Sequence, residues 1–208
     1  MALRKASEPG GLRRIEPREY VRDSAGLIEQ LQDPDVSTRR WAARDLAEHL
    51  DAAPALCAHI LKETDASVRE VIFTTLTCLG GEAVVDGMVP LLRSDDANLR
   101  NSAIEVLSSL PKLIGPRIEA LLKDADPDVR IFTVNLLGDL RHADVARWLS
   151  QVLQEDPHVN VVAAALEVLA EVGSAEALPA LKQARIRFAD DPFIGFAADL
   201  AEQRIEAS

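Results

Sequence analysis

The chain has 208 residues, of which 48% are hydrophobic and only 4% aromatic, and its formal net charge is −11. The apolar content allows a buried core, but one made of aliphatic side chains that pack closely together. The negative charge opposes binding to nucleic acid or anionic lipid and favours a protein or peptide partner with a basic surface. No apolar run reaches the length of a membrane span, so we expect no membrane partner.

The cysteine content and the start of the chain bear on its location. Cys57 and Cys78 are too few for a disulfide framework, so we expect reduced thiols. Residues 1–11 carry charge but no apolar core, so we expect no secretory signal. These features together predict a cytoplasmic protein.

The first part of the chain differs in charge from the rest. Residues 1–22 contain six Lys or Arg and three Glu, a net charge of +3, whereas the remainder carries −14. Residues 1–20 show no helical periodicity and are interrupted by glycine and proline. We expect a basic N-terminal arm over residues 1–22, partly disordered or docked, and a single domain over residues 23–208.

Four stretches of the domain repeat one pattern, in which an Asp is followed four residues later by an Arg and a further seven residues later by a Leu. The aspartates are Asp35, Asp65, Asp96 and Asp126, and the arginines are Arg39, Arg69, Arg100 and Arg130. Successive arginines are 30, 31 and 30 residues apart, a period typical of repeat proteins.

Each repeat contains two apolar stripes with the spacing of helices, separated by a short polar break. Neither stripe has anything to bury against unless the two helices pair and successive pairs stack. The first helices are predicted near residues 23–32, 52–63, 83–93, 112–123, 142–154 and 174–187. The second helices are predicted near residues 36–50, 66–79, 97–110, 127–140, 158–172 and 191–206. No strand-like alternation is present, so the predicted fold class is all-α.

The repeated Asp stands at the start of each second helix, where a carboxylate can accept unpaired backbone amides. The Arg lies one turn into the helix, on the side toward the neighbouring repeat. Its guanidinium can bond an Asp of its own or the adjacent turn. We call these eight residues the ladder and predict that they link the repeats.

This pattern resembles the HEAT-like repeats first named from phycobilisome lyase subunits, over roughly residues 24–206. The resemblance implies a right-handed α-solenoid of about six HEAT-like helix pairs, in which the ladder residues are structural. The fifth repeat has Asn160 or Val162 in place of the Arg, and the sixth has no matching Arg and a Gly195 within its helix. The ladder is therefore expected to stop after the fourth repeat, since terminal repeats are often atypical.

Motifs for chemistry are scarce. The four histidines have no partner at metal-ligating spacing, no nucleotide-binding motif occurs, and no cofactor is predicted. Deoxyhypusine hydroxylase shares the repeat type but needs His-Glu dipeptides, which this chain lacks. Few aromatic residues are available to outline a chromophore pocket, which disfavours bilin-lyase activity. We therefore predict that the chain is not an enzyme, with a lyase-like or cofactor-handling subunit as the alternative.

The exposed positions one and five residues after each Arg are expected to line the concave wall of the solenoid. Only the first repeat is basic there, which disfavours continuous contact with a phosphate backbone, so nucleic-acid binding is only the second alternative. Arg40, Trp41 and Arg44 form one candidate partner-binding group, and Ile131 and Phe132 form another, although packing between repeats would also explain the aromatic residues. The leading prediction is a non-catalytic adaptor or scaffold that binds a protein or peptide on its concave face, including a regulatory role in a bacterial complex. No oligomeric state is predicted.

Overall fold

The computed structural model describes residues 21–207, and within this range the chain is entirely helical, with twelve α-helices and no strand. The first helices of the pairs are α1 (Ser24–Gln30), α3 (Ala53–Ile60), α5 (Glu82–Met88), α7 (Pro111–Leu121), α9 (Val145–Glu155) and α11 (Leu178–Arg187). The second helices are α2 (Val36–Asp45), α4 (Ala66–Leu79), α6 (Ala97–Ser108), α8 (Pro127–Asp139), α10 (Val159–Val172) and α12 (Pro192–Glu206). Four short 3-10 segments complete the structure, namely η1 (Leu46–Glu48), η2 (Leu50–Ala52), η3 (Val89–Arg93) and η4 (Ala175–Ala177).

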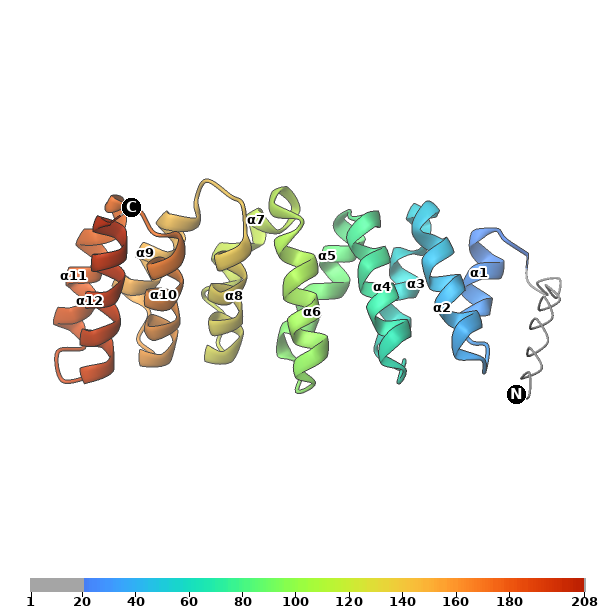
Figure 1. Ribbon diagram of the computed structural model, residues 1–208, viewed down its shortest axis with the longest axis horizontal. Coiled ribbons are helices and arrows are strands. Elements are labelled where there is room, and N and C mark those ends of the chain that lie inside the picture. The colour runs from blue at the N-terminus through green and yellow to red at the C-terminus, as the bar shows by residue number, and fades with distance from the viewer. Residues whose placement is uncertain (1–20, 208) are drawn as a thin grey trace, which may run out of the picture.

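The helix pairs stack in sequence order. Each second helix packs against the second helix of the neighbouring pair, from α2 against α4 to α10 against α12. Figure 1 shows the second helices side by side in one row, with the first helices in a row behind them. The predicted all-α solenoid of six helix pairs is therefore confirmed.

An aliphatic core runs along the whole stack. The Leu seven residues after each repeated Arg is completely buried, as are its counterpart in the fifth repeat and many Ala and Val residues. These leucines are Leu46, Leu76, Leu107, Leu137 and Leu169. Small and aliphatic side chains let neighbouring helices approach closely, which accounts for the low aromatic content.

Two helix ends differ most from the prediction. The second helix of the first pair was expected near residues 36–50, but α2 ends at Asp45 and continues as the 3-10 segment η1. In the third pair, α5 gives way to η3, whose second residue is Pro90. Proline lacks a backbone amide and clashes with the preceding helical turn, so the α-helical hydrogen bonding stops there.

The predicted basic arm over residues 1–22 lies outside the described residues except for its last two. Of these, Arg22 forms an ion pair with Asp45 at 2.8 Å. Between residues 21 and 207, none of the helices combines the length and the apolar character needed to cross a membrane.

Candidate functional site

The ladder aspartates cap the second helices. Asp35, Asp65, Asp96 and Asp126 are the N-cap residues of α2, α4, α6 and α8, and each carboxylate accepts at least one backbone amide of the first turn. The Asp35 carboxylate, for example, accepts the Thr38 amide at 2.8 Å. That amide, together with the Thr38 hydroxyl, lowers the pKa of Asp35 below its ordinary value.

Each ladder arginine bonds its own turn in the same way. Its guanidinium donates to the backbone carbonyl six residues earlier, at 2.6–3.0 Å. The four carbonyls belong to Asp33, Glu63, Ser94 and Asp124. This bond satisfies a carbonyl in the turn between the two helices, so the arginine ties the second helix to the turn of its own pair.

Across the stack, three of the four arginines bond a carboxylate in the following turn, but the acids differ. Arg39 makes a bidentate pair with Glu63 at 2.8 and 2.9 Å, and Arg130 makes one with Asp156 at 2.7 and 3.1 Å. Glu63 and Asp156 each lie two residues before an N-cap and were not included in the predicted ladder. Only Arg69 uses a ladder aspartate, at 2.9 Å from Asp96.

Arg100 differs from the other three ladder arginines, each of which bonds a carboxylate of the following turn. Within residues 21–207 its guanidinium donates to the Ser94 carbonyl at 2.7 Å and lies over the Phe132 ring, 4.2 Å from the ring centroid. The nearby Asp124 carboxylate is instead bonded to Arg93. Arg100 itself therefore makes a cation–π contact across this interface. The ion pairs between the third and fourth repeats come instead from Arg93 with Asp124 and from Arg117 with Glu82 and Asp86.

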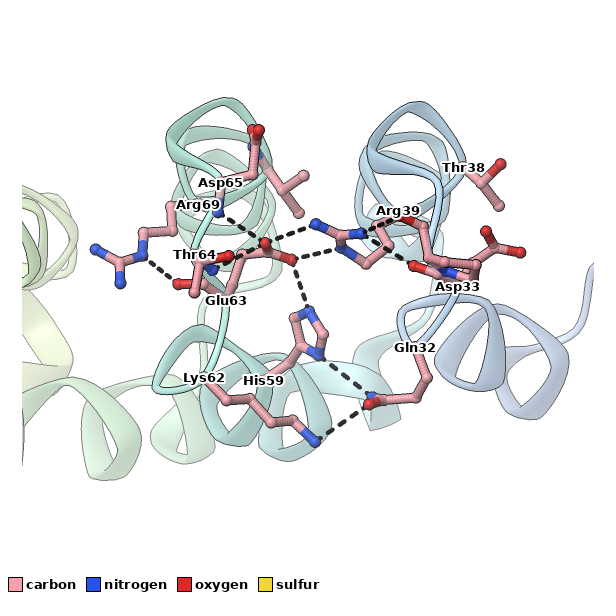
Figure 2. A network of polar contacts seen from close by, with 12 residues as sticks. Gln32, Asp33, Thr38, Arg39, His59, Lys62, Glu63, Thr64, Asp65 and Arg69 are labelled. Carbon is pink, nitrogen blue, oxygen red and sulfur yellow. Dashed lines mark hydrogen bonds and ion pairs between the residues drawn. The ribbon is translucent and has the colours of Figure 1, made fainter.

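Glu63 is the most heavily bonded carboxylate of the ladder region (Figure 2). It accepts from Arg39, from His59 Nε2 at 3.0 Å and from the backbone amides of Thr64 and Asp65. Its side chain is only 2% exposed. Burial raises the pKa of Glu63, but Arg39, the Asp65 amide and His59 outweigh burial and lower the pKa to about 2.

The network extends from Glu63 into the preceding repeat. His59 Nδ1 lies 3.3 Å from Gln32 Nε2, and the Gln32 carbonyl oxygen accepts from Lys62 at 3.3 Å. Figure 2 shows these side chains bridging the first two repeats at the level of their turns. The ladder, together with Glu63 and Asp156, thus fixes the relative position of the repeats but leaves the exposed side of the second helices free.

Two grooves lie on that exposed side. The groove between α2 and α4 has a volume of about 380 Å³ and is lined by residues that include Arg40, Arg44 and Cys78. The groove between α4 and α6 has a volume of about 630 Å³ and includes Phe73 and Glu105 in its lining. Both are lined by Glu70 and Thr74, so they adjoin along α4.

The structure separates the predicted partner-binding residues. Arg40 and Arg44 line the α2/α4 groove, whereas Trp41 lies outside the groove lining, 39% exposed, with the Arg44 guanidinium 4.1 Å from its ring centroid. Ile131 and Phe132 are half-buried and pack against the core, and Phe132 also contacts Arg100. Ile131 and Phe132 therefore lie away from the groove that contains the two arginines.

Both cysteines are free thiols, and they differ in setting. Burial raises the pKa of Cys57 to about 11, so its thiol is protonated at neutral pH. Cys78 is exposed and lines the α2/α4 groove. No cluster of three or more potential metal ligands occurs within the described range 21–207.

Sequence reasoning missed an apolar set on the last second helix. Phe193, Phe196 and Leu200 on α12 are 51%, 65% and 37% exposed. The repeats were aligned on their Arg, and the sixth repeat has none, so its positions could not be matched to those of the other repeats. Asp191, which caps α12 by accepting the Phe193 and Ile194 amides, would have supplied that register.

Comparison with known proteins places the chain among repeat proteins. A family profile described as HEAT repeats matches residues 24–108 and 114–194. Among solved structures, Drosophila melanogaster Mini spindles TOG3 is similar with a TM-score of 0.52 and 15% sequence identity, covering 88% of this chain and 93% of that chain. This likeness concerns the fold alone.

Two relatives are named for phycobiliprotein biology. Phycocyanin operon protein Z of Pseudanabaena tenuis is 25% identical over 191 residues, which cover 86% of this chain and 94% of that protein. The bilin biosynthesis protein PecE of Mastigocladus laminosus is 29% identical over 153 residues, which cover 71% of this chain and 56% of PecE.

These relatives correct one prediction. From the scarcity of motifs and aromatic residues we predicted that the chain is not an enzyme. The similarity to a protein named for bilin biosynthesis contradicts that exclusion. Motif searches fail here because an open face of a solenoid can carry a site without a contiguous sequence signature.

Proposed function

The chain belongs to the HEAT-repeat family, and we propose that it is a bilin-handling subunit of the phycobilisome-lyase type, which binds a bilin and a protein partner on the exposed face of its second helices. The relatives named for bilin biosynthesis and for the phycocyanin operon support this class of function. The observation that carries the proposal is the groove between α2 and α4, which Arg40 and Arg44 line.

The chemistry of this groove suits a bilin. A bilin is a linear tetrapyrrole with two propionate carboxylates, and arginine binds carboxylates through two parallel hydrogen bonds. Between residues 21 and 207 the Arg40 guanidinium makes no hydrogen bond or ion pair, whereas Arg44 is bonded to Asp45 and lies over Trp41. Val71 and the methyl groups of Thr74 and Thr75 offer apolar contact for the pyrrole rings.

The other depressions suit an anionic ligand less well. The α4/α6 groove shares Glu70 with the α2/α4 groove but adds Glu105, and its one arginine, Arg69, is already paired with Asp96. A third depression, of about 320 Å³, lies beside Arg130 and is lined by four carboxylates against Lys123 and Arg130. Like charges would repel the propionates there.

A titration with biliverdin, a commercially available bilin, tests the ligand. We expect the chain to induce circular dichroism in the visible bands of biliverdin, and Arg40→Glu/Arg44→Glu to weaken binding at least tenfold. The matched control, Lys112→Glu/Lys182→Glu, makes the same charge change at exposed positions of α7 and α11 and should bind normally. Equal loss in both variants would show a general charge effect and contradict a site in the groove.

An attachment assay tests the function. Incubating the chain with a bilin and apo-phycocyanin should increase covalently bound bilin, detected by zinc-induced fluorescence after denaturing electrophoresis. A chain that binds neither biliverdin nor apo-phycocyanin would contradict the proposal. A location in the cytoplasm stays a prediction.

A further inference from the structure

The exposed side of the second helices has a repeated column of positions, two, five and nine residues after each N-cap, which we call the face column. In the first repeat it contains Ser37, Arg40 and Arg44, and in the second Ser67, Glu70 and Thr74. The third, fourth and fifth repeats are also mostly polar there, with Ile131 and Ala163 as the apolar exceptions. Only in the sixth repeat are all three positions apolar, as Phe193, Phe196 and Leu200.

These three side chains do not form a stacking edge. The positions eight and eleven residues after the N-cap carry apolar side chains in the first five repeats, and in the sixth they are Asp199 and Glu202. Arg185 of α11 bonds both of these carboxylates. The edge of α12 is therefore polar and internally paired, while its face column is apolar and exposed. An exposed apolar column beside a polar edge indicates a binding surface.

The size of the patch fits the centre of an interface. A fully buried aromatic side chain covers about 150–250 Å², so the exposed parts of these three residues amount to roughly 300 Å². A stable interface needs about 800 Å² on each partner. Two phenylalanines and a leucine would thus anchor a larger contact that also includes the residues around them.

The surroundings of the patch are acidic. Glu167 occupies the ninth position after the N-cap on the neighbouring α10, the same register as Leu200, and Glu171 follows one turn later. Helices α10 and α12 pack against each other and lie side by side in Figure 1. Together they carry five acidic residues and one basic residue, Arg204, and two of the acids, Asp199 and Glu202, are paired with Arg185. Two copies meeting through this patch would bring like charges together, which disfavours self-association.

We infer that the sixth-repeat face column docks an amphipathic segment of a partner protein, one with an apolar stripe flanked by Lys or Arg. The apolar stripe covers Phe193, Phe196 and Leu200, and the basic flanks pair with Glu167 and Glu171 of α10. The inference rests on the proposed function only for the identity of the partner. It assigns two separate binding sites to the exposed side of the second helices, one for the bilin in the α2/α4 groove and one for the partner protein at the sixth repeat.

The chemistry of the segment is tested first with a synthetic probe. A helical peptide of Leu and Lys, with one apolar and one basic face, should bind the chain in a fluorescence-anisotropy titration, and a peptide with Glu in place of Lys should bind at least tenfold more weakly. Phe193→Ser/Phe196→Ser/Leu200→Ser should weaken binding of the Leu/Lys peptide at least tenfold. Because Phe193 and Phe196 are more than half exposed, the triple variant should keep its helical fold, which circular dichroism checks.

Two further variants separate this docking mode from other outcomes. Glu167→Lys/Glu171→Lys should weaken binding of the Leu/Lys peptide, whereas Glu29→Lys/Glu48→Lys, a matched change at exposed acids of the first repeat, should not. Equal binding by wild type and the triple serine variant would overturn the inference, as would a wild-type dimer that the serine variant converts to a monomer. Binding of the Leu/Glu peptide as tight as that of the Leu/Lys peptide would also overturn it.

The same variants keep the two proposals distinguishable. The triple serine variant should bind biliverdin normally but no longer bind apo-phycocyanin. Arg40→Glu/Arg44→Glu should bind apo-phycocyanin normally but bind biliverdin weakly. Peptide docking that depends on the face column, without any bilin binding, would overturn the bilin assignment alone. Bilin binding by a chain whose peptide binding ignores the face column would overturn the docking inference alone.

Discussion

At the first and third interfaces of the stack, the arginines at the same repeat position make different contacts. Arg39 and Arg100 both donate to the carbonyl six residues earlier, so each ties its second helix to the turn of its own pair in the same way. Across the interface, Arg39 meets the buried Glu63, whereas Arg100 meets the ring of Phe132. The bond within a repeat therefore follows from the repeated pattern, but the bond between repeats depends on which side chains compete for the acid.

The competition is visible in the fourth repeat. Asp124 occupies the position two residues before the N-cap, as Glu63 and Asp156 do in their repeats, yet it bonds Arg93. Arg93 lies just before the turn and reaches Asp124 from the first-helix side. An alignment of Asp and Arg positions contains no information about such a competitor.

The largest effect is expected at the first interface. Glu63→Ala would leave Arg39 and His59 without their buried acceptor, and removing one partner of a buried ion pair costs about 3–5 kcal/mol. We expect that loss in the free energy of unfolding, measured by urea denaturation. The control Glu70→Ala removes an exposed carboxylate of α4 and should change stability little. A loss below about 1 kcal/mol for Glu63→Ala would contradict a stabilising role of this network.

Acid sharpens the same comparison. The folded-state pKa of Glu63 is about 2, below its ordinary 4.5, so its contribution is present above pH 4.5 and is lost as the pH falls toward 2. We expect about 3 kcal/mol of the acid-induced loss to come from this group. Urea denaturation across this pH range should show a shallower dependence for Glu63→Ala than for the wild type. Identical slopes would show that Glu63 titrates normally.

A smaller effect is expected at the third interface. Arg100→Ala removes one charge-assisted hydrogen bond and one cation–π contact but leaves no carboxylate unpaired, a loss of about 2 kcal/mol. Phe132→Leu keeps an apolar side chain but removes the ring, so it should cause only part of that loss in stability. A loss as large as that of Glu63→Ala would mean that the two interfaces are equivalent after all.

The smallest effect is expected at Asp96. Asn caps helices as well as Asp does, so Asp96→Asn keeps the cap of α6 and weakens only the partly exposed pair with Arg69. The melting temperature should fall by less than it does for Arg100→Ala. Asp96→Ala, which also removes the cap, serves as the comparison and should cost more. Equal effects of the two variants at Asp96 would show that the cap contributes nothing.

The repeated pattern predicts the stack and its caps because both depend on local spacing. Asp65 and Arg69 are four residues apart on one helix, and that spacing alone sets their direction. Glu63 and Asp156 were missed because they lie in turns whose approach to the preceding repeat depends on tertiary packing. An acid two residues before the N-cap in those repeats was the available signal. Phe196 was missed because the register of the sixth repeat was taken from an absent Arg and not from Asp191.

Hydroxyl-radical footprinting of the chain with biliverdin and apo-phycocyanin is the most direct test of the second-helix face. It reads the exposure of individual side chains in the whole protein. We predict that oxidation of Phe193, Phe196 and Cys78 falls at least threefold on complex formation. Leu61 and Ile186, exposed on other surfaces at 63% and 77%, should react as before. Protection of Leu61 and Ile186, with Phe196 and Cys78 unchanged, would contradict the placement of the functional surface.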